Sequence, residues 1–220
     1  MDTSKDPRIL FGEKVINILE RSLQSVPVSG KKELFAKVKE MQRVLTQIKY
    51  SYLNGAALRD SDMAKELKNL CGEIARSLGK DWDAKVSPII SANIKFALNN
   101  LFNLPDRMLL PNDPAYACDI RKGKIISVEK GKNVLICKVD VGTRKITVVT
   151  NDLSAREGNE VAVAFLPPAE IYGIVSEGMF LGAGEGILKN VKGKLGELPH
   201  VPKEALEETR RKILAFIGRD

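Results

Sequence analysis

Apolar residues recur every three or four positions through the first half of the chain, which is the spacing of amphipathic helices. The clearest run consists of Leu34, Val38, Met41, Leu45, Ile48 and Tyr52. A second run covers residues 63–78 and is followed by Gly79, a residue suited to end a helix. Two more helices are expected, one around residues 15–23 and one over 87–102. The pattern predicts an N-terminal helical bundle over residues 1–104.

Three prolines, Pro105, Pro111 and Pro114, follow the last predicted helix. Proline disfavours helical backbone at the residue before it. We therefore predict a proline-rich linker over residues 105–118.

Beyond the linker the apolar period changes to two, as in half-buried strands. Five short strands are predicted, separated by glycine-containing turns. Five strands in so short a stretch are typical of an oligonucleotide-binding (OB) barrel. We expect this barrel over residues 119–187, followed over 188–220 by an extension and a C-terminal helix. The fold class is multidomain α + β, and the predicted strands are 124–128, 133–141, 144–150, 160–166 and 172–181.

The composition is that of a packed globular protein, with 44% hydrophobic and 29% charged residues. The 35 basic and 28 acidic residues leave a net charge of +7, which is spread over both halves of the chain rather than gathered in one arm. Aromatic residues make up only 5%, which argues against binding by stacking many bases. Only local clusters of basic residues can therefore indicate where a polyanion would bind.

Several classes of protein are disfavoured by the sequence. No apolar run is long enough to cross a bilayer, and the first residues lack the apolar segment of a signal peptide. The cysteines Cys71, Cys118 and Cys137 are widely separated, so we expect reduced, buried thiols. The single histidine, His200, excludes most zinc sites. We expect a cytoplasmic protein with no membrane segment and no metal or other cofactor.

The densest basic cluster lies at the start of the predicted barrel. It consists of Arg121, Lys122, Lys124, Lys130 and Lys132, and Arg144, Lys145 and Arg156 could extend it along the same rim. Basic side chains along a groove suit phosphate binding. The alternative is a solvated sheet edge whose lysines discourage aggregation. The sequence leaves both interpretations open.

Catalytic motifs are not found. The stretch 182–186 is rich in glycine but lacks the lysine and hydroxyl residue of a nucleotide-binding loop, so we interpret it as a flexible turn. Acidic residues are scattered, and no nucleophile is paired with a histidine in the sequence pattern. We expect a protein that is not an enzyme.

Two motifs resemble those of a known family. Lys138-Val139-Asp140-Val141-Gly142 is followed by Gly173-Ile174-Val175-Ser176-Glu177-Gly178-Met179. Together they are similar to the tRNA-binding OB domain appended to many methionyl-tRNA synthetases, which also occurs as free dimeric tRNA-binding proteins. The resemblance implies binding to the outer shape of tRNA or another structured RNA. It places Ser176 and Met179 in or beside the groove, with Glu177 and the glycines setting the backbone.

One stretch departs from that family. Three positions that are usually basic there are Pro167, Glu170 and Tyr172 in this chain. The loss weakens phosphate binding on that side, although the Tyr172 ring could stack on a base. The resemblance and the basic cluster together give these candidate RNA-binding residues: Arg121, Lys122, Lys124, Lys130, Lys132, Lys138, Arg144, Lys145, Asn151, Tyr172, Ser176, Glu177 and Met179.

Three functions follow as hypotheses. The first is non-catalytic binding of tRNA or another structured RNA, with assistance to an aminoacyl-tRNA synthetase or to translation. The second is an assembly module in which the OB domain makes protein–protein or dimer contacts without nucleic acid. The third is a small-molecule enzyme built on the helical half. Expected partners are therefore RNA, a synthetase and a second copy of the chain, and no membrane.

Overall fold

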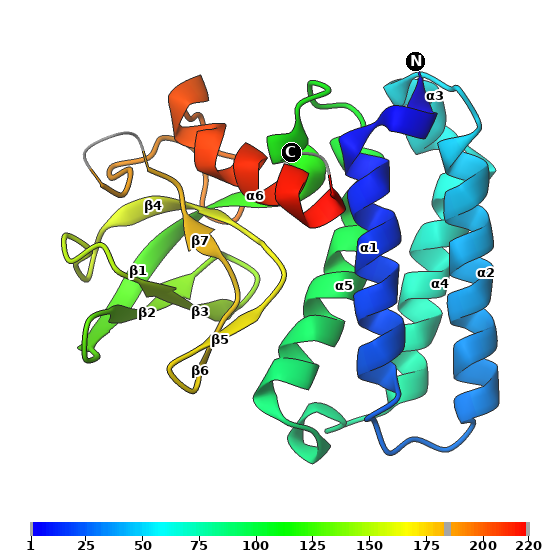
Figure 1. The fold of residues 1–220 in the computed structure, drawn as a ribbon, viewed down its shortest axis with the longest axis horizontal. Coiled ribbons are helices and arrows are strands. Elements are labelled where there is room, and N and C mark those ends of the chain that lie inside the picture. Colours follow the sequence, from blue (N-terminus) through cyan, green and yellow to red (C-terminus); the bar gives the residue numbers. More distant parts are fainter. Residues whose placement is uncertain (1, 183–185, 219–220) are drawn as a thin grey trace. The chain divides into compact units, whose positions relative to one another are not determined.

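The computed structural model describes residues 2–182 and 186–218. The chain divides into two compact units (Figure 1). The helical unit is formed by the residues up to Ala117 together with those from Ile213 onward, and the barrel unit by Cys118–Lys212. No helix in the described part of the chain combines the length and the apolarity needed to cross a bilayer.

Four long helices make the core of the helical unit and confirm the prediction of a helical N-terminal region. They are α1 (Pro7–Leu23), α2 (Lys31–Lys49), α4 (Asp62–Leu78) and α5 (Pro88–Arg107). Helix α1 packs on α5 and α2, and α4 packs on α2 and α5, which closes a four-helix bundle (Figure 1). The apolar stripe of α2 is buried from Leu34 to Ile48, as the three-and-four spacing predicts.

Two features of this unit differ from the sequence pattern. The short helix α3 (Gly55–Asp60) was not predicted, because it buries a single residue, Leu58, and so has no apolar period. Helix α5 continues through Pro105 to Arg107, into the segment predicted as a linker. Proline there stands in the last turn, where its missing N–H removes only one helical hydrogen bond. The remaining helical segments are short 3-10 turns: η1 (Thr3–Lys5), η2 (Asp83–Lys85) and η3 (Pro114–Ala117).

A buried ion pair fixes the start of α1. Asp6 is the N-cap, and its carboxylate accepts hydrogen bonds from the Arg8 backbone N–H at 2.9 Å and from Arg8 Nη2 at 2.6 Å. The Arg8 and Asp6 side chains are only 1% and 0% exposed. Arg8 Nη1 also donates to the Leu110 carbonyl at 2.7 Å. One guanidinium therefore ties the beginning of the bundle to the chain that leaves α5.

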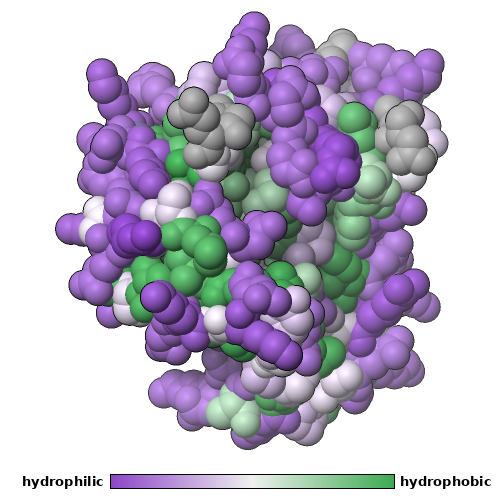
Figure 2. Space-filling model, turned by 60° about the vertical axis from the view of Figure 1, so that its left-hand side comes forward, coloured by the Kyte–Doolittle hydropathy of each residue, from purple (hydrophilic) through white to green (hydrophobic). Residues whose placement is uncertain are grey.

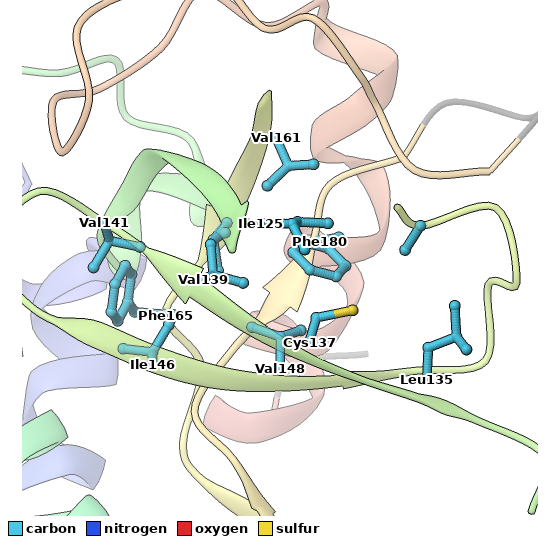
Figure 3. Packing of buried hydrophobic residues seen from close by; sticks show 12 residues of the cluster. Ile125, Leu135, Cys137, Val139, Val141, Ile146, Val148, Val161, Phe165 and Phe180 are labelled. Carbon is cyan, nitrogen blue, oxygen red and sulfur yellow. The ribbon is translucent and has the colours of Figure 1, made fainter. Parts of the chain in front are cut away.

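The barrel unit is a curled antiparallel sheet of five strands in the order β3-β2-β1-β4-β7, as predicted for an OB-type domain. The strands β5 and β6 form a separate two-stranded hairpin. The bounds are β1 (Ile120–Lys130), β2 (Leu135–Asp140), β3 (Lys145–Thr150), β4 (Glu160–Ala164), β5 (Ala169–Ile171), β6 (Ile174–Ser176) and β7 (Met179–Phe180). Alternate residues point inward and form one apolar core (Figure 3).

The predicted strand over 172–181 is divided in the structure. Tyr172 and Gly173 adopt positive φ angles of 52° and 79° and form the tight turn between β5 and β6. Gly178 then lies so close to β4 that a Cβ atom would stand 2.7 Å from the Ala164 carbonyl oxygen. The chain changes direction at both glycines, so the single predicted strand becomes β6 and β7.

The end of the described chain is helical, as predicted. The turn η4 (Lys203–Leu206) leads into α6 (Glu207–Ile217). The Phe216 ring of α6 packs against Phe11 of α1, with 5.2 Å between ring centroids. The three cysteines are buried, as predicted, and none of them forms a disulfide within the described residues. Of the glycine-rich stretch 182–186, residues 183–185 lie outside the described residues.

Candidate nucleic-acid interface

The outer face of β1, β2 and β3 gathers polar side chains from three strands. Residues paired across antiparallel strands share one face of the sheet, and along each strand that face alternates with the buried one. Buried and more exposed residues alternate along β2 and β3, and the charged residues take the exposed positions, on the face opposite the core. Two cross-strand rows result: Lys124, Asp140 and Lys145, and then Ser127, Lys138 and Thr147.

A bulge in β1 places these two rows on the same face of the sheet. The pairing shifts between Ile125, opposite Val139, and Ser127, opposite Lys138. The extra residue, Ile126, lets Lys124 and Ser127 face outward together although they are three positions apart. Without the bulge, Ser127 would lie on the core side of the sheet.

We call Lys124, Lys138 and Lys145 the lysine face. All three are exposed, and none forms an ion pair with another described residue. Lys138 Nζ donates to Thr147 Oγ1 at 2.8 Å. Hydrophilic side chains cover much of the surface seen in Figure 2, with smaller apolar areas between them. Exposed ammonium groups without acidic partners are suited to neutralising phosphates.

Asp140 lies between Lys124 and Lys145 but has a structural partner. Its Oδ1 accepts a hydrogen bond from the Gly142 N–H at 2.9 Å, and Gly142 has a φ of 82°. The Lys138–Gly142 motif therefore combines one outward lysine with the turn that leads into β3. Thr147 was not among the predicted site residues. Its position two residues after Lys145, on the same face, is the signal that could have included it.

Two more candidates, Lys130 and Lys132, lie at the turn between β1 and β2. Both side chains are exposed, and neither is paired with a described acidic residue. The Gly131 N–H donates to the Val134 carbonyl at 2.8 Å and closes the turn. Loops between the first two strands flank the binding surface of OB folds. These two lysines extend the set of unpaired charges beyond the lysine face.

Residues of the second motif close the barrel against the edge of β3. The Glu177 N–H donates to the Thr147 carbonyl at 2.8 Å, and Glu177 Oε2 accepts from the Thr147 N–H at 3.2 Å. Ser176 Oγ accepts from the Val149 N–H at 3.0 Å and donates to the Gly178 carbonyl at 3.1 Å. The edge N–H groups of β3 thus donate to side-chain oxygens, where in a wider sheet they would donate to another strand. Ser176 is only 5% exposed, so its hydroxyl serves this closure.

Two arginines flank the Phe165 ring. The guanidinium carbons of Arg121 and Arg144 each lie 5.7 Å from its centroid. Arg121 pairs with Asp119 at 3.3 Å, and Arg144 forms a short ion pair with Glu177. Both cations are therefore already balanced by carboxylates, unlike the lysine face.

The structure separates Lys122 from the rest of its sequence cluster. Its side chain is buried, and Nζ lies 3.0 Å from a Glu160 carboxylate oxygen on the neighbouring strand. Lys122 and Lys124 are two positions apart in β1 and so share a face of the sheet, and Glu160 stands opposite Lys124 in β4. The Glu160 carboxylate nevertheless pairs with the buried Lys122, whereas Lys124 stays exposed. Sequence adjacency thus grouped residues that have different environments.

The last candidates lie around the end of β3 and on the β5–β6 hairpin. Asn151 is exposed just after β3, and Tyr172 is exposed at the hairpin turn. Met179 is half-buried and pairs with Ala164 in β4. Next to Asn151, the Asp152 carboxylate accepts the N–H groups of Ser154 at 2.7 Å and Ile187 at 2.6 Å. Burial acts to raise the pKa of Asp152, but these hydrogen bonds outweigh it and the pKa is lowered.

Comparison with known proteins agrees with the two units. A family model described as "Alpha helical domain" matches residues 1–111, half of the chain. The chain belongs to the alpha helical domain family. A second model, described as "Putative tRNA binding domain", matches residues 120–206 and confirms the resemblance drawn from the two motifs. In this member of the alpha helical domain family, the barrel is thus a tRNA-binding domain.

A relative agrees with the second match. Methionine--tRNA ligase of Protochlamydia amoebophila is 42% identical over 83 residues. The similarity covers 32% of this chain and 12% of the ligase. It supports a tRNA-binding domain of the methionyl-tRNA synthetase type, on a chain that matches only a small share of the enzyme.

Proposed function

We propose that this protein is a non-catalytic, cytoplasmic RNA-binding protein that holds folded tRNA against the outer face of β1, β2 and β3. The observation that carries the proposal is the lysine face: three exposed lysines on adjacent strands, without ion pairs among the described residues, on a domain matched to tRNA binding. Lys130 and Lys132 would extend the contact along the β1–β2 turn. The Ser127 and Thr147 hydroxyls would hydrogen-bond to phosphate or ribose oxygens.

Binding of this kind depends on released counterions. Each neutralised phosphate contributes a slope of about −0.7 to −0.9 to the plot of log K against log salt. Three lysine contacts should therefore contribute about two to three units to that slope. Contacts with phosphates carry no base sequence, which fits recognition of the shape of a folded RNA.

The test is a triple variant, Lys124→Glu, Lys138→Glu and Lys145→Glu, assayed by filter binding of bulk tRNA at two salt concentrations. We expect at least a roughly hundredfold loss of affinity at low salt and a flatter salt dependence. A matched control places the same charge change on the helical unit, with Lys32→Glu, Lys39→Glu and Lys85→Glu. These lysines are also exposed and outside the ion pairs of the described residues.

The control separates a local site from overall charge. If both triple variants weaken binding equally, the interaction follows net charge and the lysine face is not the site. If neither variant changes the affinity while circular dichroism shows both folded, the proposed surface is wrong.

Assistance to an aminoacyl-tRNA synthetase is the finer form of this proposal. Similarity to part of a methionine--tRNA ligase supports it, because such a domain can raise the local concentration of tRNA near a separate enzyme. Addition of the protein to an aminoacylation assay should then lower the KM for tRNA without changing kcat. An unchanged KM at saturating protein would restrict the function to RNA binding alone.

A second candidate function is assembly, and the exposed leucines of the barrel unit favour it. Leu195 and Leu198 are each 43% exposed in the segment beside β1, where Gly196 N–H and Lys122 C=O are hydrogen-bonded at 2.9 Å. Large apolar side chains at a surface are typical of protein contacts. Sedimentation of the wild type and of a Leu195→Asp, Leu198→Asp variant tests it. A monomeric wild type that shifts tRNA would favour the first function.

A further inference from the structure

The turn of the β5–β6 hairpin presents one aromatic ring to solvent. Tyr172 is 73% exposed, more than any other large hydrophobic side chain in the residues the structure describes. It is the first of the two turn residues, since Ile171 pairs with Ile174 on either side. No core contact accounts for a tyrosine at this position.

The backbone at this position disfavours a bulky residue. Tyr172 has a φ of 52° and Gly173 a φ of 79°, so both central residues of the turn lie in the left-handed region. Two-residue hairpin turns of this kind prefer asparagine or glycine at the first position. A tyrosine there is a local conflict between sequence and turn geometry, and such conflicts concentrate at functional sites.

The base of the hairpin is fixed to β3, the strand that carries Lys145 of the lysine face. Strand β6 lies against β3, and Glu177, just after β6, exchanges hydrogen bonds with both backbone groups of Thr147. Thr147 belongs to the same cross-strand row as Lys138. A ligand held by the lysine face therefore lies next to the strand from which the hairpin extends.

The charge of the hairpin decides which part of an RNA it would contact. Residues 167–178 contain Glu170 and Glu177 and no lysine or arginine. The Glu177 carboxylate is paired with Arg144, whereas Glu170 is exposed. A phosphate would be repelled by this segment, but the face of an uncharged base would not. An aromatic ring stacks on any unpaired base.

We propose that Tyr172 stacks on an unpaired base of the RNA whose phosphates lie on the lysine face. The inference rests on the proposed function and narrows its ligand class: the preferred RNA has a helical stem with an unpaired nucleotide beside it. A plain duplex is bound through phosphates alone.

The experiment compares two RNA probes of known structure, a stem–loop and a fully paired duplex with the same stem sequence. The proteins are the full chain and its variants Tyr172→Ala, Tyr172→Phe and Tyr172→Asn. We expect Tyr172→Ala to weaken stem–loop binding by roughly 5- to 100-fold and to change duplex binding less than about twofold. Tyr172→Phe keeps the ring and should bind as the wild type does.

Tyr172→Asn is the control for the turn, because asparagine tolerates a positive φ. Its stem–loop affinity should fall as much as that of Tyr172→Ala, which assigns the effect to the ring rather than to hairpin folding. Tyr50→Ala is the control for exposed aromatics, since Tyr50 is 56% exposed on the helical unit, and it should change neither affinity. A 2-aminopurine base in the loop should be quenched by the wild type and by Tyr172→Phe, but not by the other two Tyr172 variants.

The outcomes separate this inference from the proposed function. If the lysine triple variant loses both RNAs while Tyr172→Ala loses neither, the stacking contact is wrong and phosphate binding stands. An equal loss of both probes in Tyr172→Ala would exclude selection of an unpaired base. If the wild type binds neither probe, the proposed function itself fails. A change in sedimentation of Tyr172→Ala without any change in RNA binding would identify the ring as a protein contact and overturn the inference.

Discussion

The helical and barrel units carry similar net charge and use their basic residues differently. In the helical unit, lysines bridge neighbouring helices: Lys49 to Glu13 at 2.9 Å, Lys37 to Glu73 at 3.3 Å and Lys68 to Asp106 at 2.8 Å. On the barrel, the lysine face has no such partners among the described residues. Net charge alone therefore says little about binding, since what matters is whether unpaired cations lie together on one surface, as they do on the lysine face.

The strongest test of this difference removes the buried ion pair of the helical unit. Asp6→Ala leaves the Arg8 guanidinium buried without its carboxylate and removes the N-cap of α1. We expect a loss of about 3–5 kcal/mol in the free energy of unfolding. Burial raises the pKa of Cys71 to about 12, so its thiol is unreactive in the folded unit and its alkylation rate reports opening of the helices.

The matched control is Asp62→Ala, at the first residue of α4. The Asp62 side chain is 99% exposed and its partner Lys65 is also exposed, so stability should hardly change. Affinity for tRNA should be the same in both variants at a temperature where they are folded. A loss of tRNA binding in folded Asp6→Ala protein would contradict the separation of structural and binding charges.

A smaller effect is expected from one glycine substitution made in each unit. Gly178→Ala would place a Cβ atom 2.7 Å from the Ala164 carbonyl oxygen, so the barrel should lose about 1–3 kcal/mol. Gly72→Ala, inside α4, meets only the flexible end of Arg76 at 3.4 Å and should stabilise the helices by about 0.5–1 kcal/mol.

Two of the three cysteines, Cys71 and Cys137, allow these glycine effects to be assigned to a unit. Burial raises the pKa of Cys137 to about 11, so this thiol reports the barrel as Cys71 reports the helices. Chemical denaturation combined with pulsed alkylation should show Cys137 exposed earlier in Gly178→Ala. A Gly178→Ala barrel that is as stable as the wild type, or more stable, would show that the barrel has room at Gly178 for a methyl group.

The smallest expected effect is a pH dependence in the barrel. The pKa of Asp152 is lowered from its ordinary value of 3.8, because hydrogen bonds from Ser154 and Ile187 outweigh the opposing effect of burial. Its stabilising contribution is therefore complete above the unfolded pKa and is lost as the pH falls through the folded value. Asp152→Asn should lower the Tm at pH 7, and the difference from the wild type should shrink below about pH 4. A difference that does not change with pH would assign the effect to shape rather than charge.

Long elements with a strong period were predictable from the sequence. The spacing from Leu34 to Ile48 predicted α2, and strict alternation predicted β2 and β3. Helix α3 has too few buried residues to produce a pattern, and the division of the last strand depends on how close Gly178 comes to β4. The spacing of apolar residues along the chain does not predict which segments distant in sequence come into close contact.

The candidate site was only partly predictable for the same reason. Alternation is enough to turn Lys138 and Lys145 to one face. The burial of Lys122 depends on Glu160, which lies on another strand, and the position of Lys124 depends on a bulge at Ile126. Ser176 was expected in or beside the groove and Glu177 was expected to set the backbone, and the hydrogen bonds of both residues to β3 explain the motif as the closure of the sheet.

The contact between Phe11 and Phe216 has a consequence for synthesis of the chain. The helical unit includes the residues from Ile213 onward, which the ribosome makes only after the whole barrel sequence. Domains usually fold in order from the N-terminus as the chain emerges. The side of the Phe11 ring that Phe216 covers therefore stays exposed until α6 has been translated. The barrel unit can complete its fold before the helical unit does.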